Sequence, residues 1–186
     1  MPNGWNFADV YEVVADQVPD ATCQVQGDRR LTWGEVDRRA ASFANAAGSF
    51  LALVESLDAT QWDAPSVEDG RAIGTVAHHV ALGYAIGQWR VIAAASGYPQ
   101  PLQQGTATER NAAHAAGTPA PDRDATLRLL RTGADALESA IRSLRDDQLD
   151  GEIRVGPVTG TTGRLVDSGR DHVIEHEITV RRSVSA

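Results

Sequence analysis

The chain has 186 residues, of which 42% are hydrophobic, and it carries a formal net charge of -8. This length fits one ordinary domain with its own core, and the negative charge argues against nucleic-acid binding, because basic surfaces gather phosphates. All 17 basic residues are Arg, so mechanisms that need a lysine, such as Schiff-base chemistry or a P-loop, are excluded.

The cysteine usage and the hydropathy pattern indicate the compartment. Cys23 is the single cysteine, so there is no disulfide framework and a reducing environment is the simplest interpretation. The N-terminus has no basic segment followed by an apolar run, and no stretch reaches the roughly 18 apolar residues of a membrane span. We therefore expect a cytoplasmic protein that does not associate with membranes.

Residues 1–40 have a pattern of their own. Helical spacing over 7–18 is followed by two short predicted strands at 21–26 and 31–33 with turn residues between them. We predict a small appendage made of a helix and a β-hairpin. Over residues 7–47 the sequence resembles the N-terminal opening of the AMP-forming acyl-CoA synthetases, most clearly in the run Gly-Asp-Arg-Arg-Leu-Thr-Trp-Gly-Glu-Val. Those enzymes use a catalytic lysine, so we expect a fused structural remnant without adenylation activity.

From residue 40 onward, apolar residues recur at intervals of three and four, which predicts amphipathic helices. Four long helices are expected, at 40–58, 71–95, 122–147 and 161–184. This pattern predicts an all-α fold, in which a four-helix bundle over residues 41–186 carries the small N-terminal appendage. Bundles of this type form cofactor sites between facing helices.

The connections between these helices differ in length. Residues 59–70 are expected to be a loop and 151–160 a connector. The segment 99–121 is long and poor in bulky apolar residues, and it is expected to be a crossover with a short helix at 106–116.

Two histidines of the last helix give the strongest functional signal. His172 and His176 are four residues apart, so their side chains lie on one helical face about 6 Å apart and reach the same point. Neutral imidazole binds zinc, nickel, iron and copper, but two ligands rarely suffice. His79 is the best third ligand, because it lies at the margin of the inward face of its helix whereas His78 lies near the opposite side. The alternative is a pair of partly buried histidines bonded to backbone carbonyls.

Four other side chains are relevant to this site. Glu175 and Glu177 flank the histidine pair, and either is placed to orient a ring through its second nitrogen, as metal-bound histidines require. His114 in the crossover is within possible reach of the site, but exposure to solvent is the expected state for such a residue. Cys23 has no neighbouring histidine to activate it, so we do not expect it to be a nucleophile.

The helix order and the histidine motifs resemble a known superfamily. The relevant segments are Trp62 and Gly70 leading into Val-Ala-His-His-Val-Ala at 76–81, and the closing Asp-His-x-x-Glu-His-x-x-x-x-Arg at 171–181. Over residues 41–186 they resemble the DinB-like superfamily, also called the YfiT-like or thiol-transferase bundle family. The resemblance implies that His79, His172 and His176 bind a divalent metal, zinc or nickel, with positions left for water or substrate.

The resemblance also implies a class of activity. Related proteins include transferases that use bacillithiol or mycothiol and a mycothiol-dependent maleylpyruvate isomerase. We therefore expect a metal-dependent thiol transferase or hydrolase that acts on a small molecule, with a low-molecular-weight thiol as possible cosubstrate and a homodimer as a plausible assembly. The alternative is a non-enzymatic bundle that binds a small molecule or a protein, with structural histidines or an incidental metal. An enzyme leaves a coordination position open, whereas a structural site is closed by a fourth protein ligand.

Overall fold

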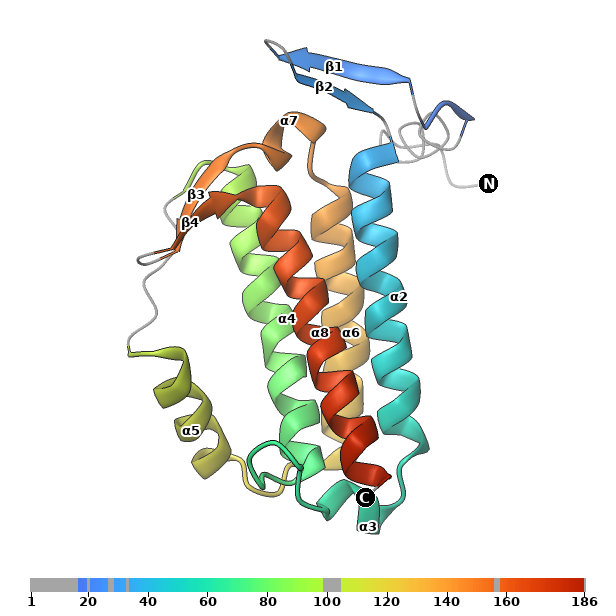
Figure 1. Ribbon diagram of the computed structural model, residues 1–186, viewed down its shortest axis with the longest axis vertical. Helices are drawn as coiled ribbons and strands as arrows, with labels where there is room; N and C mark the ends of the chain where they lie inside the picture. Colours follow the sequence, from blue (N-terminus) through green and yellow to red (C-terminus); the bar gives the residue numbers. More distant parts are fainter. Residues whose placement is uncertain are drawn as a thin grey trace, which may run out of the picture.

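The computed structural model describes residues 17–19, 21–26, 29–32, 34–98, 105–155 and 158–185. Its main body is a bundle of four long helices (Figure 1): α2 (Gly34–Ser56), α4 (Ile73–Ala95), α6 (Arg123–Arg142) and α8 (Thr162–Val184). The predicted all-α four-helix bundle is confirmed. The first helix begins six residues earlier than expected, and the third ends five residues earlier.

The direction of the helices decides which of them face each other. Helices α2 and α8 run one way, and α4 and α6 run the other way (Figure 1). Each helix packs against two neighbours, so that α4 and α2 both contact α6 and α8. Helices α4 and α8 are therefore antiparallel neighbours. Since α4 and α6 are consecutive long helices with the same direction, the chain has to return along the bundle between them.

That return is the predicted crossover, and it contains the expected short helix, α5 (Ala107–Gly117). Helix α5 begins with a capping box, in which Thr106 and Glu109 each bond the backbone N–H of the other. Directly after α5 in the sequence, the chain is fixed to the start of α4, because Thr75 Oγ1 donates to the carbonyls of Thr118 (3.0 Å) and Pro119 (3.2 Å). The crossover is thus attached beside the lower half of α4 (Figure 1).

The core lies between the four long helices. The predicted inward face of α4 is buried at every expected position, namely Ile73, Val76, Val80, Tyr84 and Val91. The rings of Phe43 and Tyr84 meet edge to face with centroids 5.5 Å apart. Trp62 packs directly on Gly74, where an added Cβ would lie 2.3 Å from the indole Nε1. Glycine is therefore required there by the close approach of the ring.

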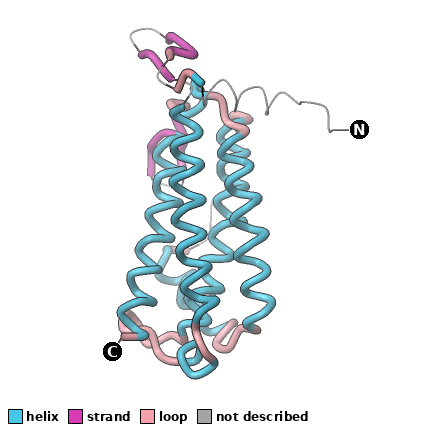
Figure 2. The backbone as a smooth tube through the Cα atoms, turned by 90° about the vertical axis from the view of Figure 1, so that its right-hand side faces the viewer, coloured by secondary structure: helices cyan, strands magenta, loops and turns pink. Residues whose placement is uncertain are grey.

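Two connections are more ordered than the sequence indicated. The expected loop 59–70 begins with a short helix, α3 (Ala59–Asp63), which Asp58 caps. The expected connector 151–160 is instead an antiparallel hairpin of β3 (Glu152–Val155) and β4 (Val158–Thr161), which follows the short helix α7 (Asp146–Leu149). Both hairpins of the protein lie toward the same end of the bundle (Figure 2). Strands of four residues carry too little periodicity to distinguish them from a loop.

The expected N-terminal hairpin is present as β1 (Thr22–Gln26) and β2 (Arg29–Thr32), paired antiparallel. The helix expected at 7–18 lies almost wholly outside the described residues. Helix α2 continues through residues 40 and 41, so one helix spans the position where the two parts of the chain were divided, and that division stays a prediction. Within the described ranges, no helix combines the length and the apolar character needed to cross a membrane.

Candidate metal centre

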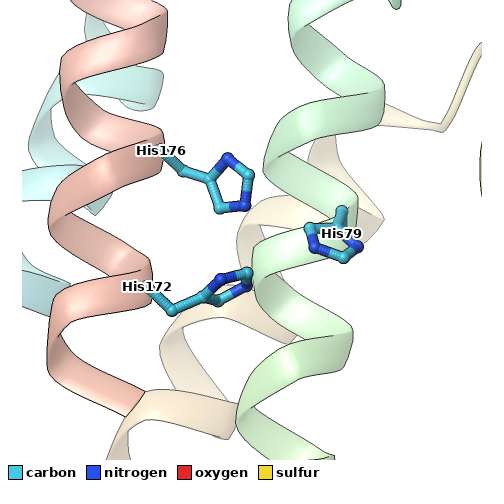
Figure 3. A group of neighbouring side chains, drawn as sticks. All are labelled: His79, His172 and His176. Carbon is cyan, nitrogen blue, oxygen red and sulfur yellow. The ribbon is translucent and has the colours of Figure 1, made fainter. Parts of the chain in front are cut away.

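The candidate site lies between α4 and α8, which present one and two histidines to each other (Figure 3). His79 is one residue before the buried Val80, at the edge of the inward face of α4. His172 and His176 are separated by one turn of α8 and flank the buried Val173. All three rings are partly buried. The helix periodicity thus brings together the three residues that the sequence singled out.

The three rings are close enough to share one ligand. One ring nitrogen from each of His79, His172 and His176 can be chosen so that all three atoms lie within 4.8 Å of one another. The ring centroids are 5.2 Å apart for His79 and His172, 5.1 Å for His79 and His176, and 4.5 Å for His172 and His176. Every pair is close to perpendicular, with interplanar angles of 71°, 81° and 87°. Rings at these angles meet edge to face and do not stack.

Electrostatics keep these imidazoles neutral. Burial and the neighbouring His172 lower the pKa of His79 from 6.5 to about 4, and Arg71 and His114 add to the effect. Burial, His172, His79 and Arg71 lower the pKa of His176 to about 3. The pKa of His172 is lowered by burial against an opposing effect of Glu175. The neutral form of imidazole is the form that binds metal ions.

The second nitrogens of the pair are not oriented as the sequence suggested. Glu177 is directed away from the rings, since it accepts hydrogen bonds from Ser49 Oγ (2.8 Å) and from Arg181 Nε (2.9 Å). His176 Nδ1 is buried and has no hydrogen-bond partner among the described residues. Glu175 is exposed and acts on His172 only through its charge. Among the described residues, neither Glu175 nor Glu177 forms a hydrogen bond with a ring, and Ser49 and Arg181 share Oε1 of Glu177.

Two further histidines, His78 and His114, lie beside the triad. His114 Nε2 lies 2.9 Å from His78 Nδ1, and the two rings are nearly parallel, with an interplanar angle of 9°. The centroid of His114 is also 5.6 Å from that of His79. Exposure to solvent, the state expected for His114, is thus not observed. The sequence held one clue, because His78 and His114 are the only histidines outside the triad.

A polar hollow of about 520 Å³ opens along α8 on the side of His172. Its described lining comes from one helix: Arg164, Asp167, Ser168, Arg170, Asp171, His172 and Glu175. Of the triad, only His172 belongs to this described lining. Small-molecule sites are concave and hold a few polar groups that converge on the ligand.

The donor set fits a divalent metal. Three neutral imidazoles from two rigid helices form a common ligand set for zinc and related ions. The buried His176 Nδ1, which no group of the described residues satisfies, is a polar atom whose burial calls for a partner. In the part of the chain that the structure describes, no fourth His, Cys, Asp or Glu joins the group. The assignment of His79, His172 and His176 as metal ligands itself stays a prediction.

The parallel α4 and α6, the long crossover between them, and one histidine facing two across α4 and α8 define a bundle of the DinB-like superfamily. Comparison with protein families gives the particular family. The model of the mycothiol maleylpyruvate isomerase N-terminal domain matches residues 43–178. The chain belongs to this family.

Solved structures show the same fold. The chain is similar to the crystal structure of the mycothiol-dependent maleylpyruvate isomerase, with a TM-score of 0.68 and 16% sequence identity over 78% of this chain and 60% of that one. It is also similar to YfiT from Bacillus subtilis, described as a probable metal-dependent hydrolase with an unusual four-helix bundle topology. That match has a TM-score of 0.66 and 17% identity, and covers 92% of this chain and 99% of YfiT. A search of curated proteins found no match to the sequence.

The chain thus spans about 60% of the length of the isomerase that it resembles. By contrast, it spans nearly all of YfiT. The TM-scores of 0.68 and 0.66 establish a common fold, and at identities of 16% and 17% the reaction has to be argued from the site.

Proposed function

We propose that this protein is a divalent-metal-dependent enzyme, and that it acts with a low-molecular-weight thiol on a small molecule, as a thiol-dependent transferase or hydrolase. The observation that carries the proposal is the triad itself. Three neutral imidazole nitrogens lie within 4.8 Å of one another, and no fourth protein ligand joins them among the described residues. A site with three protein ligands keeps a position for substrate, as catalytic zinc sites do.

The role of the protein groups follows from their placement. His79, His172 and His176 would hold the ion, and their low pKa values keep them available as ligands throughout the neutral and mildly acidic range. A divalent ion held by neutral ligands keeps its full positive charge and favours the ionised form of a thiol or water that binds to it. The hollow beside His172 would admit the substrate, and the two rigid helices fix the ligand positions.

The comparisons support a low-molecular-weight thiol as the cosubstrate. One structural relative is the mycothiol-dependent maleylpyruvate isomerase, and the other is described as a probable metal-dependent hydrolase, so proteins of this fold include one that depends on a thiol. Zinc or nickel is the metal that we propose, because both bind imidazole well. A small-molecule substrate, a homodimer and a cytoplasmic location remain part of the proposal. Light scattering of the purified protein would measure the oligomeric state.

The first experiment is elemental analysis of protein purified without an affinity tag, together with a variant that combines His172→Ala and His176→Ala. We expect about one equivalent of zinc or nickel in the parent protein and none in the double variant. A His78→Ala variant is the matched control, because His78 is adjacent to His79 and lies outside the triad. It should keep the metal.

Two outcomes would change the interpretation. A parent protein that contains no metal and does not bind zinc at micromolar concentration would refute the metal-dependent enzyme. If X-ray absorption spectroscopy of the bound metal shows four protein ligands, the alternative is favoured, namely a non-enzymatic binding bundle with a structural ion. With an open position established, mycothiol, bacillithiol and their conjugates are the first substrates to screen.

A further inference from the structure

Next to the triad, one arginine is held in place by a well-ordered loop. Arg71 precedes α4 in a turn closed by hydrogen bonds from Ser66 N to Arg71 O (2.7 Å) and from Gly70 N to Ser66 O (2.9 Å). Gly70 has a φ of 75°, which only glycine adopts without strain. The arginine is thus presented by backbone bonds that do not involve its own side chain.

The same loop is fastened to the helix that carries His172 and His176. Val67 N donates to Ser183 Oγ at 3.0 Å, and Thr179 Oγ1 donates to Glu68 Oε2 at 3.2 Å. These two contacts lie within two turns of His176 along α8. They fix the distance between the loop and the triad, so Arg71 keeps its position relative to the histidines.

The guanidinium of Arg71 is only partly satisfied. Its Nε lies 2.6 Å from Asp69 Oδ2, and the Arg71 side chain is 13% exposed. Its Nη1 is buried and has no hydrogen-bond partner among the described residues. A buried charged donor without a partner is costly, and such a group calls for an acceptor, which a water molecule or an anion can supply.

The charge of the guanidinium also acts on the triad. Its charge contributes to lowering the pKa of His79, His176 and His114, after the larger effect of burial. A fixed positive charge beside a site for a divalent cation opposes binding of that cation, since like charges repel at short range. The arrangement is favourable when an anion lies between the two positive centres.

We propose that Arg71 is an anion-binding subsite of the metal centre, and that the substrate or thiol carries a carboxylate that Arg71 Nη1 binds while the other end of the molecule reaches the metal. The inference rests on the proposed function and specifies its substrate class. Arginine suits this role because its planar donors match the geometry of a carboxylate. Asp69 forms an ion pair with the guanidinium at Nε, and both Nε and Nη1 lack a hydrogen-bond acceptor among the described residues.

The test uses cobalt(II) in place of the natural metal, because a thiolate bound to cobalt gives a charge-transfer band that reports ligand binding without any turnover. The two probes are 3-mercaptopropionate and 3-mercaptopropionamide, which have nearly the same shape and differ by one negative charge. Propionate and propionamide, followed by the ligand-field bands of cobalt, make the same comparison without a thiol. The proteins are the full chain, Arg71→Gln, Arg71→Lys and the exposed control Arg128→Gln.

The measured quantity is the ratio of the dissociation constants for the amide and the acid. We expect Arg71→Gln to lower this ratio about tenfold relative to the parent, as loss of one charge-assisted hydrogen bond implies. Affinity for the amide should stay the same, Arg71→Lys should keep part of the preference, and Arg128→Gln should keep all of it. Equal cobalt content and equal circular dichroism in all variants would show that the metal site is intact.

Cobalt binding and the amide-to-acid ratio distinguish failure of the proposed function from failure of the Arg71 subsite. If the parent protein does not bind cobalt, both the proposed function and the Arg71 subsite are refuted. If cobalt binds and the ratio is the same in the parent and in Arg71→Gln for both pairs of probes, the metal site stands and the Arg71 subsite is refuted.

Discussion

The low pKa values of the triad predict how the stability of the metal-free protein depends on pH. In the unfolded chain, histidine takes up a proton below about pH 6.5, whereas His79 and His176 in the folded protein do so only near pH 4 and pH 3. Because the folded pKa values are the lower ones, the unfolded state binds more protons between these limits. The stabilisation that comes from these two neutral histidines is therefore fully present above pH 6.5, and the free energy of unfolding falls as the pH decreases toward 4.

The size of the effect follows from the same values. Each histidine contributes up to about 1.4 kcal/mol per pH unit, so two of them contribute at most about 4 kcal/mol between pH 6.5 and pH 5. Both rings are partly open to solvent, which screens the interaction, and we expect a loss of about 2 kcal/mol. Urea unfolding of chelator-treated protein at pH 7, 6 and 5 measures this loss.

The control is a variant that combines His79→Gln and His176→Gln, which should show a much smaller decrease over the same range. Nitrogen NMR of the rings gives an independent readout, since both imidazoles should still be neutral at pH 5. A parent protein equally stable at pH 7 and pH 5, or a double variant with an undiminished decrease, would refute the reasoning.

Three further predictions concern stability. Tyr84→Phe should raise the free energy of unfolding by about 1 kcal/mol, because the buried Tyr84 hydroxyl has no partner among the described residues; a lower stability of this variant in urea would contradict the assignment. Gly74→Ala should lower it by about 1–3 kcal/mol, since the added Cβ would meet the Trp62 ring at 2.3 Å, and an unchanged unfolding midpoint would show that the ring moves easily. Free zinc at 100 times its dissociation constant should stabilise the parent by about 2.7 kcal/mol, and a thermal shift of equal size in His172→Ala would place the zinc elsewhere.

The local sequence predicts much of the site. The spacing of His172 and His176 places both rings on one face of α8, whatever the rest of the chain does, because the helix repeats every 3.6 residues. The same periodicity identified the inward face of α4 and placed His79 at its margin. These are local properties, and the long helices that carry them have enough turns for the pattern to be clear.

Other features arise only when distant segments meet. His114 lies 36 residues from His78 in sequence, and nothing in either neighbourhood indicates that the crossover returns beside α4. Glu177 was one of two candidates to orient a ring, but its Oε1 accepts a hydrogen bond from Ser49, which is 128 residues away. Such partners depend on how α2, α5 and α8 pack, and no local pattern encodes that packing.

The sequence by itself therefore determined the helices, the bundle and the identity of the three converging histidines, because these depend on periodicity along single helices. The tertiary structure decided the surroundings of the triad. It brought Arg71 close enough to act on His79 and His176, left Arg71 Nη1 buried without a partner, and paired His78 with His114. Burial and charge interactions are sums over neighbours from several segments, so they exist only once those segments are packed together.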